Sequence, residues 1–320
     1  MTRDFRIFSG TANEELAELI ARALGVRLAA STVSRFPDGE ISVELLEPVR
    51  RKEVFIVQPT APPVSEHLVE LLAFVDASRR AAAGRITAIV PYFGYARADK
   101  RHGRREPITA SLVADLLQCA GVDHLVTVDL HAAQIEGFFR VPVDNLSAVT
   151  TLGSAVAERL STETIVVSPD AGRVRMASEY ASRLGVPVVV LHKRRRSGAD
   201  TEITHVVGDV RDRACLIVED MIATGGTLAD AIEALLGAGA RPELTIAATH
   251  GLLLAGARAK LDHPAVRQVF VTDTVAVRHR DWNKLRVVTV APVIARAIER
   301  FMADGSLADL YVPPRLAGRT

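Results

Sequence analysis

Two carboxylates stand three residues before a glycine- and threonine-rich segment in residues 218–227, VEDMIATGGT. The preceding apolar run, Cys215 to Val218, is typical of a buried strand, which places Glu219 and Asp220 at its carboxyl end. Thr224 to Thr227 then lead into a helix, whose first backbone N–H groups and positive dipole end favour a phosphate. The carboxylates cannot hold that phosphate, but they can accept hydrogen bonds from sugar hydroxyls or from water around a metal ion. The pattern indicates a ligand with a phosphate at one end and a polyol at the other.

The loop differs from a nucleotide P-loop, because no lysine follows its glycines. Glycines permit close backbone approach to an anion, and threonines add hydroxyl donors. A glycine-rich turn alone is also compatible with a purely structural role. The paired acids and the strand and helix around the turn favour the binding interpretation.

Basic residues gather in two short segments, one from Arg97 to Arg105 and one from Lys193 to Arg196. The net charge is only +1, so the chain as a whole exerts no pull on nucleic acids or acidic membranes. Nothing aromatic interleaves the basic runs, which also argues against single-stranded nucleic acid. Each run alone is compatible with a solvated surface. Two of them in a neutral protein indicate a small polyanionic ligand.

These residues need elements to position them, and the sequence alternates apolar runs with segments of helical spacing. Such alternation is typical of parallel strands covered on both faces and predicts an α/β fold. The expected strands are residues 53–57, 86–90, 125–128, 164–167, 187–191, 214–218, 244–248 and 286–290. The expected helices are residues 64–83, 109–120, 171–184, 227–236 and 292–302, with Gly121 and Gly185 at two of their carboxyl ends.

The 320 residues suggest two domains of roughly 150 residues each, and the halves echo each other. ITAIV followed by Pro91 resembles TIVVS followed by Pro169 in the second half. The second half carries about a dozen extra residues, which we assign to the polar segment 192–205 and interpret as a mobile flap between strands. The boundary is expected near residues 148–153, giving domains 1–149 and 150–320. The C-terminal tail is also expected to pack back on the N-terminal domain.

Composition places the chain among ordinary globular proteins, with 24% charged and 48% hydrophobic residues. No apolar stretch is long enough to span a bilayer, and the segment MTRDFRIFSG lacks the apolar core of a signal peptide, so we expect a cytoplasmic protein without a membrane partner. Cys119 and Cys215 both lie in apolar sequence and are expected to be small core residues.

The loop resembles the phosphoribosyl diphosphate (PRPP) binding motif of type I phosphoribosyltransferase folds, and the chain as a whole resembles the ribose-phosphate pyrophosphokinases, or PRPP synthetases. The segments that carry this resemblance are FPDGEISVEL (36–45), PYFGYARADKRHGRREPITASLVADLL (91–117), TVDLHAAQIEGFF (127–139), NLSAV (145–149), VSPDAG (167–172), HKRRRSG (192–198) and THGLLLAGA (249–257). It implies two tandem type I phosphoribosyltransferase-like domains, each a mainly parallel sheet flanked by helices, assembled as homohexamers. The implied reaction moves the β,γ-diphosphate of ATP to the anomeric hydroxyl of ribose 5-phosphate, with Mg²⁺, to give PRPP and AMP.

The resemblance also assigns roles to individual residues. Ribose 5-phosphate would be held by Asp220, Ala223, Thr224, Gly225, Gly226 and Thr227. ATP would be bound by Arg97 and Asp99, and by Phe36, Asp38 and Glu40 from a neighbouring subunit. His131 and Asp170 would contact Mg²⁺ or the ATP phosphates, and Lys193 and Arg195 would close over the reaction as catalytic flap residues. On their own, His131 is compatible with a structural histidine, Asp170 with a helix cap, and Phe36 with either core or an exposed turn.

Four positions depart from the commonest family pattern. Ala223 and Glu219 stand where aspartate is usual, Ala98 where glutamine is frequent, and Arg173 where glycine is frequent. Two other functions therefore stay open, a phosphoribosyltransferase that consumes PRPP and a non-catalytic member that regulates an active partner. The duplication and the basic flap argue against the first. The presence of Lys193, Arg195, His131 and Asp170 argues against the second.

Overall fold

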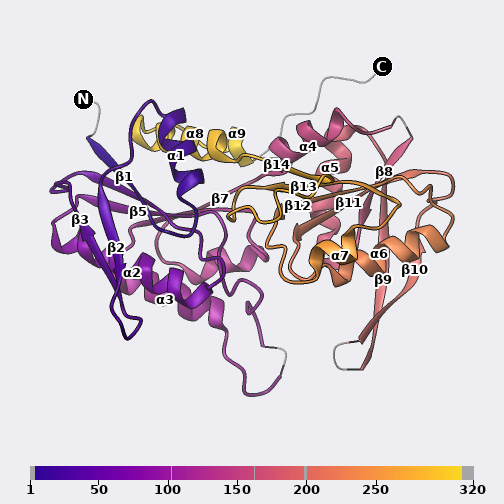
Figure 1. Ribbon diagram of the computed structural model, residues 1–320, viewed down its shortest axis with the longest axis horizontal. Coiled ribbons are helices and arrows are strands. Elements are labelled where there is room, and N and C mark those ends of the chain that lie inside the picture. Colours follow the sequence, from indigo (N-terminus) through magenta and orange to yellow (C-terminus); the bar gives the residue numbers. More distant parts are fainter. Residues whose placement is uncertain (1–3, 102, 162, 198–199, 312–320) are drawn as a thin grey trace. The chain divides into compact units, whose positions relative to one another are not determined.

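A computed structural model describes residues 4–101, 103–161, 163–197 and 200–311, without the side chains of residues 193–204, 309 and 311. Its contacts divide the chain into two compact units (Figure 1). Among the described residues, the first comprises 4–147, 274–276 and 290–311, and the second comprises 148–273 and 277–289. The chain thus leaves the first unit near the expected boundary and returns to it through its C-terminal helices.

The first unit is built on a five-stranded parallel sheet in the order β1-β4-β5-β6-β7. Its strands are β1 (Phe5–Ser9), β4 (Glu53–Val57), β5 (Arg85–Val90), β6 (His124–Val128) and β7 (Val143–Leu146). β4 and β6 are buried along their full lengths, as expected for mainly apolar parallel strands covered on both faces. Every strand is added on the same side of the previous one, so the order of this sheet never reverses.

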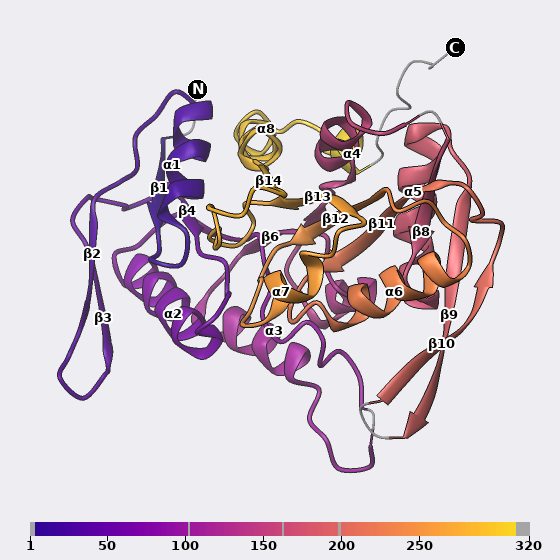
Figure 2. The same cartoon turned by 45° about the vertical axis from the view of Figure 1, so that its right-hand side comes forward.

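Helices cover both faces of this sheet. α1 (Glu14–Ala23) packs against α8 (Ala291–Met302) on one face, and α2 (Val64–Arg80) packs against α3 (Thr109–Ala120) on the other (Figures 1 and 2). The return of α8 is fixed in part by Phe301, whose ring meets that of His124 edge to face at 4.6 Å. The remaining elements are the antiparallel hairpin of β2 (Ser31–Arg35) and β3 (Ile41–Leu45), the 3₁₀ helix η1 (Ala133–Phe138) and α9 (Ala308–Tyr311).

The second unit carries a seven-stranded sheet in the order β10-β9-β8-β11-β12-β13-β14. Its strands are β8 (Thr164–Ser168), β9 (Val188–Ser197), β10 (Asp200–Val207), β11 (Ala214–Met221), β12 (Leu244–His250), β13 (Val266–Thr272) and β14 (Leu285–Val288). All neighbours pair in parallel except β9 and β10, which form an antiparallel hairpin at one edge (Figure 2).

Helices also cover both faces of the second sheet (Figure 1). α4 (Val149–Ala157) and α5 (Val174–Leu184) pack together on one face, while α6 (Gly226–Gly237) and α7 (Ala257–Leu261) pack together on the other. A short 3₁₀ helix, η2 (Ala171–Arg173), precedes α5. The prediction of an α/β protein with two mainly parallel sheets is confirmed.

Three sequence-based expectations need correction. The helix expected from residue 171 begins at Val174, because Asp170 accepts a hydrogen bond from the Gly172 amide and caps a 3₁₀ turn instead. The segment 192–205 is largely a paired hairpin and not a loop between strands. Cys119 is exposed near the end of α3, whereas Cys215 is buried as expected. Within the described residues, no helix is long and apolar enough to cross a membrane.

Candidate functional site

The order of the second sheet reverses between β8 and β11. From β8 the chain passes through α5 to β9 on one side, and later returns through β11 on the other side of β8. In open α/β sheets, the crevice outside the carboxyl ends of two such strands is the usual place for a ligand. Asp170 follows β8, and Glu219 and Asp220 lie near the carboxyl end of β11. The topology therefore brings three carboxylates to the switch point.

The phosphate-loop residues lie next to these acids, between β11 and α6. Gly225 is the N-cap of α6 and has a left-handed backbone at φ 73°, which favours glycine. It has no side chain to offer the amides of the first helical turn, so those donors stay available to a ligand. The loop is tied down behind, where the Ala223 carbonyl accepts a hydrogen bond from the Leu254 amide at 2.9 Å. Local geometry therefore agrees with an anion site at residues 224–227.

The two acids of β11 are covered by one guanidinium. Nε of Arg173 donates to Oε1 of Glu219 at 2.8 Å, and Nη2 of Arg173 lies 3.0 Å from Oδ2 of Asp220. The Asp220 side chain is only 3% exposed and that of Glu219 is 9% exposed. Both acids also receive backbone donors, from the Asp220 amide to Glu219 and from the Met221 amide to Asp220. Arg173 departs from the family pattern, and its local sequence did not predict this contact.

Charge in this cluster is unevenly matched, because one guanidinium faces three carboxyl groups. Burial, with Asp220 beside it, raises the pKa of Glu219 to about 8. Burial opposes the charged form of Arg173, but its attraction to Asp220 and Glu219 outweighs that effect, and its pKa lies above the usual value. Glu219 and Asp220, the acid pair, thus lie beside a permanent cation, Arg173.

Asp170 has a definite local role at the tip of β8. Its side chain accepts a hydrogen bond from the Gly172 amide at 2.8 Å, and its carbonyl accepts one from the Ser168 hydroxyl. The capping interpretation of Asp170 is therefore confirmed as a contact. Because it also attracts Arg173 and lies beside the acid pair, a role toward a bound phosphate or cation stays a prediction.

In the first unit, Arg97 and Asp99, expected to bind ATP, lie in the loop after β5, and His131, expected to contact Mg²⁺ or the ATP phosphates, lies in the segment after β6. Arg97 is exposed, while Asp99 is buried and accepts a hydrogen bond from Nε2 of Gln134 on η1. His131 is partly exposed just before η1. It follows Asp129, whose backbone has φ 41°, and Leu130, whose amide donates to Asn145 at 3.0 Å. These contacts fix the segment on which His131 sits.

The tip of the β2–β3 hairpin carries Phe36, Asp38 and Glu40, all exposed. The Phe36 amide donates to the Glu40 carbonyl at 2.9 Å, and the Glu40 amide donates to Oδ1 of Asp38 at 3.1 Å. The tip is therefore an ordered turn, and the alternative of Phe36 as a core residue is wrong, since it is 54% exposed.

Lys193 and Arg195 belong to strand β9, where the backbone pairs with β10 at Ile203 and Thr201 respectively. Their side chains lie outside the part of the chain that the structure describes. The basic hairpin is thus placed at the edge of the second sheet, next to β8, and the roles of its side chains remain predictions.

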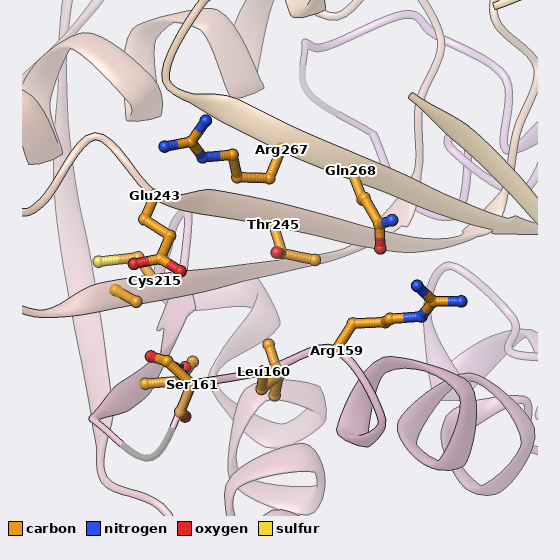
Figure 3. Close-up of a pocket in the computed structure, with 10 residues that line it drawn as sticks. Arg159, Leu160, Ser161, Cys215, Glu243, Thr245, Arg267 and Gln268 are labelled. Carbon is orange, nitrogen blue, oxygen red and sulfur yellow. Dashed lines mark hydrogen bonds between the residues drawn. The ribbon is translucent and has the colours of Figure 1, made fainter. Parts of the chain in front are cut away.

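A cavity of about 210 Å³ lies at the opposite end of the second sheet (Figure 3). Thr164, Ala214, Thr245 and Arg267 line it from the amino-terminal ends of four parallel strands. Because the phosphate loop and the acids lie at the carboxyl ends of the same sheet, this cavity is separate from the candidate site.

Two family models match successive parts of the chain. Residues 5–121 match the N-terminal domain of ribose phosphate pyrophosphokinase, and residues 145–284 match the phosphoribosyl transferase domain. Ribose-phosphate pyrophosphokinase of Clostridium tetani is 41% identical over 313 residues, which cover 97% of this chain and 98% of the relative. The chain belongs to the ribose-phosphate pyrophosphokinase family.

Other members of the ribose-phosphate pyrophosphokinase family support the same assignment. The enzyme of Haemophilus ducreyi is 44% identical, over 96% of this chain and 99% of its own length. The crystal structure of phosphoribosylpyrophosphate synthetase from Mycobacterium smegmatis matches with a TM-score of 0.89 and 42% identity, covering 95% of this chain and all of that one. The family suggested by the sequence motifs is therefore confirmed.

Proposed function

We propose that the chain transfers the β,γ-diphosphate of ATP to the anomeric hydroxyl of ribose 5-phosphate, forming PRPP and AMP. The observation that supports this most is the phosphate loop at the N-terminus of α6, set beside an acid pair at the β8/β11 switch point. Family membership supports the reaction, and this geometry supports binding of a sugar phosphate at the loop.

In this proposal the sugar phosphate is held at both ends. The amides and hydroxyls of residues 224–227 take the 5-phosphate, as the free first turn of a helix favours. Asp220 accepts hydrogen bonds from the ribose hydroxyls. Ala223 contributes its backbone only, and its missing carboxylate removes one negative charge from the loop. Holding the sugar at two ends orients the anomeric hydroxyl for attack on the β-phosphorus, from which AMP departs.

Phosphoryl-type transfer depends on positioning and charge neutralisation more than on covalent catalysis. We assign Arg97 and Asp99 to ATP binding, with Phe36, Asp38 and Glu40 provided by a neighbouring subunit. Lys193 and Arg195 neutralise charge on the transferred diphosphate and on AMP. Lys does so as a compact point charge, and Arg through a bidentate grip on phosphate oxygens.

Mg²⁺ is the implied metal. The arrangement of the acids bears on whether protein side chains or substrate phosphates would bind it. Among the described residues, no group of three or more His, Cys, Asp or Glu side chains is arranged to hold a metal ion. Mg²⁺ commonly binds through one or two carboxylates and substrate phosphates instead of an all-protein cage. The residues therefore fit an ion carried by ATP, with His131 and Asp170 as its proposed contacts. When bound, the ion would neutralise phosphate charge.

The exposed turn of the β2–β3 hairpin also supports an assembly of several copies. The Phe36 ring is 54% exposed at the tip of an ordered hairpin, which leaves apolar surface in contact with water. Stacking on the adenine of ATP bound by a neighbouring subunit would bury that surface. We therefore propose a homo-oligomer of at least two subunits, with a hexamer as the family expectation.

The test of the reaction is release of AMP from ATP in the presence of ribose 5-phosphate and Mg²⁺, with no nucleobase added. AMP that requires ribose 5-phosphate supports a diphosphokinase, because a PRPP-consuming transferase has no use for ATP. A folded protein that binds ribose 5-phosphate but releases no AMP would favour the regulatory alternative.

A further inference from the structure

The guanidinium of Arg173 contacts both members of the acid pair. Its Nε and Nη2 reach one oxygen of Glu219 and one of Asp220 at 2.8 and 3.0 Å. All three side chains are at most 15% exposed. Backbone amides of β11 also donate to these acids, from Asp220 to Glu219 and from Met221 to Asp220. Because all three side chains are almost fully buried, sugar hydroxyls or the water shell of a cation would compete with the guanidinium for these two carboxyl groups.

We propose that Arg173 is a specificity-determining residue that competes for Glu219 and Asp220, so that a sugar diol or a hydrated divalent cation must displace its guanidinium. The identity of the diol as ribose 5-phosphate rests on the proposed function. The competition itself rests only on the contacts among the three side chains.

The surroundings of Arg173 allow its guanidinium to move away from the acid pair. It is the last residue of η2, and its neighbours Ala171 and Gly172 are exposed. Its backbone lies at φ −105° and ψ 3°, which any residue adopts without strain. Asp170 also attracts it, so a third carboxylate can receive the guanidinium once the acid pair is released. Displacement therefore exchanges one charged partner for another.

The residue types at positions 223 and 173 also disfavour binding of divalent cations at the acid pair. Ala223 adds no carboxylate to the acid pair, while Arg173 adds a permanent positive charge beside it. A cation approaching Glu219 and Asp220 thus meets repulsion as well as an occupied site. The inference is that this chain binds divalent cations at its sugar subsite more weakly than the acid pair alone would.

The first test is calorimetric binding of ribose 5-phosphate to the full chain, the Arg173→Gly variant and an Arg175→Ala control. Arg175 lies two residues further on, its side chain is 84% exposed, and it pairs only locally with Glu179. A charge-assisted hydrogen bond that need not be broken corresponds to about tenfold or more in affinity. We expect Arg173→Gly to bind ribose 5-phosphate about tenfold more tightly in the presence of Mg²⁺, and Arg175→Ala to match the unmodified chain. Equal or weaker binding by Arg173→Gly would overturn the proposal.

The second test uses Mg²⁺ alone and thermal unfolding. Freed carboxylates bind the ion in the folded state, so Mg²⁺ should raise the Tm of Arg173→Gly and leave that of the unmodified chain unchanged. Equal responses would contradict the competition. Arg173→Gln, which keeps much of the side-chain volume, carries both tests if the glycine variant does not fold. Absence of ribose 5-phosphate binding in every protein would count against the proposed function, while the Mg²⁺ response would still decide the role of Arg173.

Discussion

Gly225 and Ala257 meet at the base of the phosphate loop, where a Cβ added to Gly225 would lie 3.4 Å from the Ala257 carbonyl oxygen. The backbone at Gly225 has φ 73°, a conformation that side chains other than glycine adopt only with strain. The start of α7 thus lies against the N-cap of α6. The added Cβ would make only an ordinary van der Waals contact, so the backbone conformation explains glycine at this position of the loop.

We predict that Gly225→Ala destabilises the fold by about 1–3 kcal/mol, the usual cost of a non-glycine residue in the left-handed region. It should also weaken ribose 5-phosphate binding, because strain relief shifts the amides of the loop. Urea unfolding and calorimetry measure the two effects. The matched control is Gly237→Ala at the end of α6, where the added Cβ meets nothing within 4 Å and stability should rise by about 0.5–1 kcal/mol. Equal effects of the two substitutions would contradict this account of the loop.

Replacing Lys193 by alanine should lower turnover by about 10³-fold, because it removes a cation proposed to neutralise the transferred diphosphate. Ribose 5-phosphate affinity should stay unchanged, since Lys193 lies on β9 and the phosphate loop precedes α6. Arg211→Ala provides the control, because that side chain is 76% exposed and pairs with Asp209. Steady-state kinetics decide the matter. Near-normal turnover of Lys193→Ala would remove this residue from the reaction.

Phe36→Ala should raise the KM for ATP by about tenfold or more, the effect expected from loss of one base–aromatic stack. The Tm should not change, because the ring is 54% exposed and contributes little to the core. Leu46→Ala is the matched control, since Leu46 is equally exposed beside the same hairpin. An unchanged KM for ATP in Phe36→Ala would exclude the ring from nucleotide binding.

The two cysteines should differ in reactivity toward a thiol reagent at pH 8. Burial raises the pKa of Cys215 to about 12, so its thiolate fraction at that pH is on the order of 10⁻⁴. Cys119 is exposed. We predict one fast thiol per native chain, lost in Cys119→Ser, and two thiols after unfolding in urea. Rapid labelling of native Cys119→Ser would show that Cys215 is accessible.

Strands with continuous apolar runs were the most predictable part of the fold. The expected strand at residues 53–57 coincides with β4, and α3 coincides with the helix expected at residues 109–120. The carboxyl ends of α3 and α5 also have the left-handed glycines expected, Gly121 and Gly185. Both signals are local: burial on two faces leaves an unbroken apolar run, and a positive φ demands glycine.

Partly exposed elements gave weaker signals. β2 and β3 alternate between half-buried and exposed residues, and β7 has only four residues, so neither produces a continuous apolar run. The polar residues of the basic hairpin predict a loop, because they mask the pairing of β9 with β10. Such elements are defined by their tertiary neighbours more than by their own composition.

The phosphate loop was predictable because its amides, glycines and helix start are adjacent in sequence. The Arg173 contact was not, because Arg173 and Glu219 are 46 positions apart and meet only when β8 and β11 pair. The one available signal was the order of strands, which places the segment after β8 beside the tip of β11. Long-range ion pairs at a switch point require that topology before they can be anticipated.

Diphosphate transfer can be observed by phosphorus NMR of the purified chain with ribose 5-phosphate, ATP, Mg²⁺ and inorganic phosphate. PRPP and AMP are followed in the same sample, together with ADP. We predict that PRPP and AMP appear in equal amounts, with no ADP formed. Intact ATP in a sample of folded protein, or ADP in place of AMP, would contradict the account.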